Sequence, residues 1–416
     1  MTCSQDRIDS VQGRIGELIA AHRPGWTLQQ PFYTDPAIFD LELEKIFLRS
    51  WLFAGHVSQI PRRGDYFLYE IARESMIIIR GDKDHVHALV NVCRHRGSRV
   101  CVEPSGHAQS LVCPYHNWVY ALDGALQSAR LMPENFDKSQ FGLRRAQAQV
   151  VEGLIFISLA EEPPRLAAAL GDIQPHLEPY QLAQARICHS EDHDLPANWK
   201  LLNENFRECY HCRANHPELC QLMPHISLES PQALEEFENW AELSQNRWRN
   251  KGLTAPNIPI SAENGHHVMR FPFKKGYVSQ TMDGQLAAPL LGRFTDPDAG
   301  IVAGSILPTF WLELSVDYAM LMQITPSSPT VTRIHLDFLV RGDAVEGVDF
   351  ELERLTRFWR LTLEQDYKLC EISQAGVSSR HYTPGPYAPG ITAKSSLGEK
   401  GPQAFIAWYL NQLASA

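Results

Sequence analysis

The chain has 416 residues, of which 44% are apolar and 21% charged, so it is long enough for two or more domains with a sizeable core. Its net charge is −10, from 38 basic and 48 acidic residues, and no basic run stands out, which argues against a nucleic-acid partner. The first residues lack a signal-peptide pattern and no apolar run approaches membrane-spanning length, so we expect no membrane association and a cytoplasmic location. In that compartment the nine cysteines are expected to be free thiols or metal ligands.

Two helices are predicted in the N-terminal segment, residues 1–50. The first is amphipathic, runs from Ile8 to His22 and is stopped by Arg23-Pro24-Gly25. The second starts at the N-cap Asp35 with Pro36 in its first turn, and it presents an apolar stripe of Phe39, Leu43, Ile46 and Phe47. We expect this segment to pack on the catalytic domain.

Short β-rich runs separated by turns begin at Tyr66. They predict a small all-β domain over residues 51–162, followed by the linker Glu161-Glu162-Pro163-Pro164. The expected strands are Tyr66–Tyr69, Met76–Ile79, Val86–Val90, Leu111–Val112 and Ile155–Ser158.

Two loops of this domain each carry one cysteine and one histidine. Cys93-Arg94-His95 is followed, after seventeen intervening residues, by Cys113-Pro114-Tyr115-His116. A Rieske [2Fe–2S] centre has four ligands, two of them histidines on one iron, so this pattern indicates such a cluster. Zinc also takes two cysteines and two histidines, but its usual spacing keeps the two cysteines together and the two histidines together. A coincidental set of core and surface residues is the third alternative.

A second ligand set is indicated in the domain that follows, residues 163–416. A helix opening at Pro196–Lys200 is expected to place Leu201, Asn205, Glu208 and Cys212 on one face, with His211 three residues after Glu208. Because Pro217 follows His216, helical geometry should fail at or before His216. A helix that breaks after His211 would let both imidazoles face one point; two surface histidines are the alternative.

The remaining chain is predicted as a polar, loop-rich region, a sheet and a long helix. Residues 220–300 carry a basic tip at Arg270–Gly276, and strands Tyr318–Ile324 and Thr330–Val340 flank a turn at Pro326–Pro329. The last helix is expected from Val348 to Ser373, with an apolar stripe of Leu355, Phe358, Trp359, Thr362, Leu369 and Cys370.

Asp366 lies in the middle of that apolar stripe. A carboxylate that faces a core is costly unless it is paired or bound to a metal. A buried arginine is one possible partner. Joining Asp366 to His211 and His216 instead gives the 2-His-1-carboxylate set that holds Fe(II) with open positions for dioxygen.

These motifs together resemble the oxygenase (α) subunit of Rieske non-haem iron oxygenases. The resemblance rests on the two cluster loops, then Asn198-Trp199-Lys200, Glu204-Asn205, Glu208-x-Tyr210-His211 and His216-Pro217, then Glu364-Gln365-Asp366. It implies an α+β chain: an all-β Rieske domain, then a helix-grip catalytic domain with an antiparallel sheet wrapped around a long C-terminal helix. It also implies Cys93, His95, Cys113 and His116 as cluster ligands, and His211, His216 and Asp366 as ligands of a mononuclear Fe(II).

Within the family, Glu208 resembles the carnitine, glycine betaine and proline betaine monooxygenases, because ring-hydroxylating dioxygenases typically have Asp there. The stretches Gln30–Tyr33, Ser279–Gly284 and Gly385-Pro386-Tyr387 are also similar to the betaine demethylases, whereas Phe310–Glu313 and Asp317-Tyr318 lack the histidines typical of that region.

The resemblance implies an oxygenase component that hydroxylates an N-methyl group of a betaine-like quaternary ammonium compound, with release of formaldehyde. The implied partner is an NAD(P)H-dependent flavin and iron–sulfur reductase. The implied assembly is a homotrimer, in which Glu208 links the iron to His116 of the partner subunit. Binding of the quaternary ammonium should use aromatic faces, with Trp311, Phe310, Tyr318 and Tyr210 as candidates.

Two other functions stay open. An aromatic ring-hydroxylating dioxygenase would share all the metal ligands. An electron-transfer Rieske protein would need only Cys93 to His116 and would hold two irons per chain instead of three.

Overall fold

The computed structural model describes residues 12–228, 230–253, 256–390 and 398–415. Within them the chain forms two compact units, one of residues 48–166 and the other built from the described parts of residues 1–47 and 167–416. We describe each unit by itself.

The unit of residues 48–166 is all-β, as predicted. A seven-stranded antiparallel sheet has the order β1-β10-β9-β4-β3-β2-β5, and a three-stranded sheet has the order β6-β7-β8. The strands are β1 (Leu52–His56), β2 (Asp65–Ile71), β3 (Glu74–Arg80), β4 (Val86–Val90), β5 (Ser105–His107), β6 (Leu111–Val112), β7 (Val119–Tyr120), β8 (Leu126–Ser128), β9 (Arg145–Val151) and β10 (Leu154–Ser158). The runs at 76–79 and 154–158 are fully buried because they lie inside the larger sheet.

The other unit contains a six-stranded antiparallel sheet of order β11-β16-β15-β14-β13-β12. Its strands are β11 (Ala185–Leu195), β12 (His266–Phe271), β13 (Ile301–Ile306), β14 (Phe310–Leu314), β15 (Ala319–Ser328) and β16 (Val331–Arg341). The helices are α2 (Pro31–Thr34), α3 (Pro36–Lys45), α4 (Leu166–Leu177), α5 (Trp199–Asn205), α6 (Cys212–Asn215), α7 (Pro217–Leu222), α8 (Pro231–Asn250), α9 (Leu352–Val377) and α10 (Lys400–Ala414).

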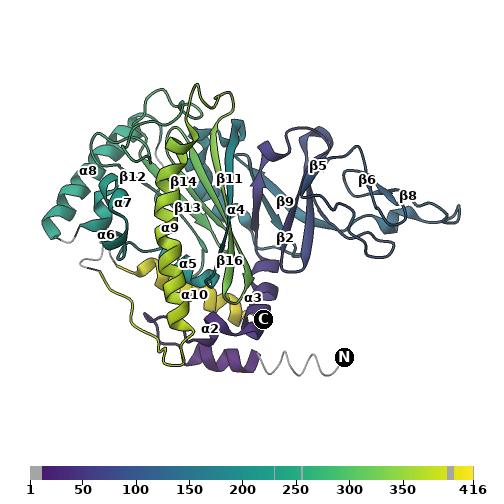
Figure 1. Cartoon of the computed structure of the whole chain (residues 1–416), viewed down its shortest axis with the longest axis horizontal. Coiled ribbons are helices and arrows are strands. Elements are labelled where there is room, and N and C mark those ends of the chain that lie inside the picture. Colours follow the sequence, from purple (N-terminus) through teal and green to yellow (C-terminus); the bar gives the residue numbers. More distant parts are fainter. Residues whose placement is uncertain (1–11, 229, 254–255, 391–397, 416) are drawn as a thin grey trace. The chain divides into compact units, whose positions relative to one another are not determined.

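The long helix α9 packs across one face of this sheet (Figure 1). Its buried residues share a hydrophobic core with inward-facing residues of β15 and β16. The members of this contact are Leu355, Phe358, Leu363 and Cys370 from the helix, and Met320, Met322, Leu336 and Phe338 from the sheet. This is the predicted helix-grip arrangement, so the α+β fold is confirmed.

The N-terminal segment is anchored to α5 by buried polar contacts. The Asp35 side chain caps α3 as predicted, by accepting a hydrogen bond from Ala37 N–H. Farther along α3, Glu42 Oε1 lies 2.6 Å from Lys200 Nζ with both side chains fully buried. Glu42 Oε2 also accepts a hydrogen bond of 2.8 Å from Trp199 Nε1. The pair of opposite charges makes burial of each charge tolerable.

A half-buried carboxylate, Glu204 on α5, joins two of the family-like stretches. Glu204 accepts hydrogen bonds from Tyr33 Oη at 2.8 Å and from Tyr387 Oη at 2.7 Å. Burial raises the pKa of Glu204 to about 7, although both hydroxyls and the nearby Lys200 lower it. The stretches 30–33 and 385–387 therefore meet at one side chain.

Several predicted boundaries are wrong. Residues 12–20 are helical, but residues 8–11 of the first predicted helix lie outside the described residues. Helix α3 ends at Lys45 instead of continuing through the Phe47 position. The turn between β15 and β16 comes after Ser328, because β15 continues past Pro326 through a register shift. Helix α9 starts at Leu352, four residues later than predicted.

The region of residues 220–300 is also more ordered than predicted. It contains the 20-residue helix α8, capped by Ser230, and the strand β12. Arg270, predicted on a basic loop tip, is instead in β12 with 5% of its surface exposed. Among the described residues, no helix is long and apolar enough to cross a membrane.

Candidate functional site

The chain between α5 and α7 is broken in a way that brings two histidines together. Asn198 caps α5 by accepting a hydrogen bond from Lys200 N–H, and the helix ends at Asn205. The predicted continuous face from Leu201 to Cys212 is therefore wrong, because the helical register stops before Glu208. His216 has φ −124° and ψ 70°, which is not helical, as expected for a residue before Pro217.

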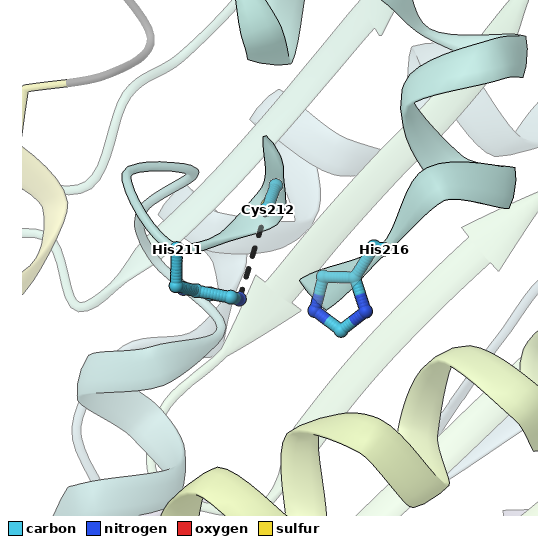
Figure 2. A group of neighbouring side chains, drawn as sticks. All are labelled: His211, Cys212 and His216. Atoms are coloured by element: carbon cyan, nitrogen blue, oxygen red, sulfur yellow. Dashed lines mark hydrogen bonds between the residues drawn. The ribbon is translucent and has the colours of Figure 1, made fainter. Parts of the chain in front are cut away.

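The two imidazoles and the carboxylate of Asp366 converge. His211 Nε2 lies 3.2 Å and His216 Nε2 lies 3.0 Å from Asp366 Oδ1, and the two ring centroids are 5.1 Å apart. Figure 2 shows the ring of His211 pointing toward that of His216. The three residues that sequence reasoning selected thus lie together.

The other ring nitrogens are held by neighbouring side chains. His211 Nδ1 lies 2.5 Å from Glu208 Oε1, which accepts its hydrogen. His216 Nδ1 lies 2.6 Å from the amide nitrogen of Gln365, which also donates to Glu218 Oε1 at 2.8 Å. Both rings are thereby held with Nε2 facing Asp366, and the Glu208 contact is of the kind that orients a metal-bound histidine.

The electrostatics of the set favour a cation between the three residues. Burial lowers the pKa of His211, but the hydrogen bonds to Asp366 and Glu208 outweigh it and raise that pKa to about 10. Burial raises the pKa of Asp366, but the two imidazoles lower it below its ordinary value. His211 is therefore protonated in the metal-free site, and binding of Fe(II) would displace that proton and leave two neutral imidazoles and a carboxylate as the ligand set.

Cys212 is a fourth polar group at this point. With His211 and His216 it forms a group whose ligand atoms all lie within 4.8 Å of one another. Its Sγ is 3.8 Å from His211 Nε2, the contact dashed in Figure 2. The hydrogen bond to Cys209 and burial raise the pKa of Cys212, so it is a neutral thiol there.

A cavity of about 500 Å³ contains these donor groups. Its wall is formed by residues between 205 and 226, by α9, by positions of β12 to β15, and by Pro259, Ile260, Gly398, Lys400 and Gly401. Trp311 lines it, as predicted, but Phe310 and Tyr318 do not and are buried elsewhere. Tyr210 is 63% exposed, so it is also not part of the wall.

Sequence reasoning missed several wall residues. The aromatic ones are Phe206, Phe271 and Trp359, and the charged ones are Arg207 and Glu313. Strand alternation was the available signal, because 311 and 313 point to the same face of β14.

In the unit of residues 48–166, the two predicted cluster loops share one backbone design. Gly97 N–H donates to Cys93 O, and Asn117 N–H donates to Cys113 O. Gly97 and Asn117 have φ of 77° and 55°, the left-handed conformation that such tight loops require. Each loop thus turns sharply just after its histidine.

The four side chains separate by type. Cys93 and Cys113 are 3% and 1% exposed, whereas His95 is exposed. The rings of His95 and His116 have centroids 4.6 Å apart, and that of His95 stacks on Trp118 at 4.8 Å. Paired buried thiols and paired outer imidazoles suit a cluster with one iron on each pair.

Comparisons with known proteins agree with this architecture. Residues 50–143 match the family described as the Rieske [2Fe-2S] domain, and residues 182–415 match the ring hydroxylating alpha subunit (catalytic domain). Two solved structures share the fold. A quaternary ammonium Rieske monooxygenase has a TM-score of 0.73 at 22% identity, covering 95% of this chain and 98% of its own. A Rhodococcus naphthalene 1,2-dioxygenase has 0.71 at 20% identity, covering 97% and 98%.

Two relatives of higher identity cover nearly the whole chain, and a third covers about half of it. The glycine betaine monooxygenase oxygenase subunit of Pseudomonas aeruginosa (strain UCBPP-PA14) is 36% identical over 411 residues, which are 98% of this chain and 94% of that protein. The corresponding subunit of Chromohalobacter salexigens is 35% identical over 413 residues, covering 99% and 91%. The carnitine monooxygenase oxygenase subunit of Escherichia coli (strain K12) is 34% identical over 202 residues, covering 46% and 52%. The chain therefore belongs to the Rieske non-haem iron oxygenases and is a monooxygenase α subunit with a [2Fe–2S] cluster and a mononuclear iron.

Proposed function

We propose that this subunit hydroxylates an N-methyl group of a betaine-like quaternary ammonium compound and so releases formaldehyde. The observation that carries the proposal is the aromatic wall of the cavity that contains His211, His216 and Asp366. A quaternary ammonium has no hydrogen to donate, so aromatic faces are its natural binding surface. Full-length similarity to glycine betaine monooxygenase subunits supports the same substrate class.

We assign His211, His216 and Asp366 as the iron ligands, and Cys93, His95, Cys113 and His116 as the cluster ligands. When bound, the iron would supply the activation of O₂ for insertion of one oxygen atom into a C–H bond. Glu208 and Gln365 orient the two imidazoles through their Nδ1 atoms. The apolar wall formed by Met223, Ile226, Met320, Met322 and Leu363 keeps bulk water from the reacting methyl group.

The product of hydroxylation would be an N-hydroxymethyl ammonium. Loss of its hydroxyl proton forms the C=O bond of formaldehyde, while the C–N bond breaks and its electron pair stays on nitrogen. A demethylated tertiary amine results. This collapse needs no further oxidant.

We also propose that electrons arrive from an NAD(P)H-dependent flavin and iron–sulfur reductase through the cluster. In this scheme Glu208 connects the iron site to His116 of the partner subunit, and the working assembly is a homotrimer. Inter-subunit electron transfer is described for a solved quaternary ammonium Rieske monooxygenase of the same fold, which supports the scheme by analogy.

A substrate screen tests the proposed reaction. The subunit, loaded with iron and supplied with a reductase and NAD(P)H, is offered glycine betaine, proline betaine, carnitine and choline, and formaldehyde is measured. We expect release with at least one zwitterionic betaine. No release from any of them, together with a cis-diol from naphthalene, would instead identify an aromatic ring-hydroxylating dioxygenase.

A further inference from the structure

The cavity wall carries a buried acidic residue, Glu313, that contacts no cationic side chain among the residues that the structure describes. Glu313 lies on β14, opposite Ala303 of β13 and Met320 of β15, and it is 6% exposed. Its Oε1 accepts a hydrogen bond of 3.0 Å from Trp311 Nε1, and its Oε2 accepts one of 3.2 Å from Gln280 Nε2. Both donors are neutral. Among the residues that the structure describes, Glu313 forms no ion pair.

The neighbours of Glu313 hold it in a fixed position. Ser315 Oγ donates to Gln280 Oε1 at 3.0 Å, so the amide NH₂ of Gln280 is directed at the carboxylate. Gln280 and Ser315 are fully buried. Burial raises the pKa of Glu313 to about 8, although Trp311 and Gln280 lower it, so without a cation nearby the group is mostly protonated at pH 7. A cation bound on the open side, which is the cavity, would favour the carboxylate form.

The same wall carries a cation whose described contacts include no carboxylate. Arg207 Nη1 lies 3.1 Å from Ser305 Oγ and 3.3 Å from His267 Nδ1, and its Nη2 lies 3.1 Å from Asn203 Oδ1. All three contacts are to groups without negative charge, and within the described residues Arg207 Nε has no hydrogen-bond partner. Burial lowers the pKa of Arg207 to about 9, so it is still cationic at neutral pH.

Trp311 connects the two charged groups. Arg207 Cζ is 5.2 Å from the centroid of the Trp311 ring, and the indole N–H of the same residue donates to Glu313. In the described parts of the chain, Arg207 and Glu313 do not pair with each other. An aromatic surface between an acidic group, which a bound cation would ionise, and a guanidinium cation is complementary to a ligand that carries both charges.

We propose that Glu313 and Arg207 form a zwitterion-reading pair, in which Glu313 faces the quaternary ammonium and Arg207 faces the carboxylate of one betaine molecule. Trp311 supplies a cation–π surface next to Glu313, and Gln280 with Ser315 positions the carboxylate. This inference rests on the proposed function and deepens it, because it names the residues that set substrate specificity. It also explains how a chain without the histidines typical of this sheet region can select a betaine.

Binding of two ligands that differ in the carboxylate tests the pair. Glycine betaine has both charges, and choline has the ammonium without the carboxylate. We would measure the Kd of each by calorimetry with the iron-loaded protein under argon. The variants are Glu313→Gln and Arg207→Met, and the controls are Glu353→Gln and Arg357→Met, two exposed side chains that pair with each other on α9.

Each variant has its own expected signature. Glu313→Gln should weaken both ligands roughly 10-fold or more, because it removes a charge-assisted contact that both share. Arg207→Met should weaken glycine betaine by a similar factor and leave choline within about two-fold, since only the betaine uses the guanidinium. Arg207→Lys should restore part of the preference for the betaine. The controls should bind as wild type does.

The contrary outcomes separate this inference from the proposed function. Unchanged Kd values in Glu313→Gln, or equal losses for both ligands in Arg207→Met, would overturn the zwitterion-reading pair while wild-type formaldehyde release still stood. If wild type binds neither ligand, the proposed function itself fails. Each variant must keep the visible spectrum of the cluster and its thermal midpoint. If Glu313→Gln does not fold, Glu313→Asp replaces it: it keeps the charge but withdraws it from the ligand by one methylene, so it should weaken both ligands by equal factors, and unchanged Kd values would overturn the pair.

Discussion

Removing the Glu208 carboxylate should weaken iron binding by a predictable amount. Glu208 Oε1 is 2.5 Å from His211 Nδ1, and its side chain is only 11% exposed. Its Oε2 also accepts hydrogen bonds from the backbone N–H groups of Tyr210 and His211. A hydrogen bond between such groups contributes about 1.5–3 kcal/mol, or roughly 10–150-fold in affinity. We therefore expect Glu208→Ala to lose about 10–100-fold in iron affinity, the usual effect of losing an orienting partner.

Glu208→Gln separates the two roles assigned to this residue. The amide oxygen still accepts from His211 Nδ1, so iron should stay bound, but the carboxylate proposed to face the partner subunit is lost. Iron affinity is measured by competition with a chelator, and electron transfer by stopped-flow reoxidation of the reduced cluster with O₂ and substrate. We expect Glu208→Gln to hold iron, to be reduced normally and to fail in reoxidation. Wild-type iron affinity in Glu208→Ala would refute the orienting role, and wild-type reoxidation in Glu208→Gln would refute the electron path.

Three further changes test other parts of the molecule. Asp366→Ala should lower the iron content from three to two per chain, keep the cluster spectrum and abolish turnover. The control Glu364→Ala, at an exposed position, should retain all three irons. A third iron in Asp366→Ala would contradict the ligand assignment. Cys113→Ala should abolish the EPR signal of the reduced cluster, but Cys101→Ala, a buried thiol outside the loops, should keep it, and a full signal in Cys113→Ala would exclude that ligand. The pKa of Glu204 is raised from 4.5 to about 7. Its contribution to the free energy of unfolding is therefore fully present below pH 4.5 and is lost as the pH rises to 7. The loss amounts to about 3 kcal/mol. The thermal midpoint of Glu204→Gln, relative to that of wild type, should therefore be higher at pH 8 than at pH 5. A difference between the two proteins that does not change with pH would contradict the burial argument.

Much of the fold and the metal-binding motifs could be predicted from the sequence, because short-range rules determine them. The proline after His216 disfavours helical φ/ψ at that position, and His216 is non-helical in the structure. An acid inside an apolar stripe, as at Asp366, signals a buried charge that needs a partner. The spacing within the two cysteine–histidine loops similarly reflects a local backbone design, in which each loop closes on its own cysteine carbonyl.

Features that depend on long-range packing were missed or misplaced. The end of α5 at Asn205 has no glycine or proline to mark it, so the predicted helix continued too far. Helix α8 was missed because its surface is mostly polar and exposed, although Ser230 and Pro231 offered an N-terminal signal. Arg270 looked like part of an exposed basic tip because its burial depends on Tyr180 and Ala299, which are distant in sequence.

The charged residues of the cavity wall also could not be predicted from the sequence. Alternation shows that Trp311 and Glu313 share a face of their strand, but not that this face is turned toward the iron ligands. No pattern in the sequence assigned Arg207 to the cavity. Its side chain contacts Asn203, Ser305 and His267, since the early end of α5 lets it face the sheet.

The measurement that tests the central claim most directly is the fate of methyl deuterium in a single turnover. Glycine betaine with three CD₃ groups is mixed with the fully reduced, iron-loaded protein and O₂, and the products are analysed by mass spectrometry. N-demethylation predicts dimethylglycine with six deuterium atoms and formaldehyde with two. An oxygenated product that retains all nine methyl deuterium atoms, or consumption of O₂ without any change in the betaine, would contradict the account.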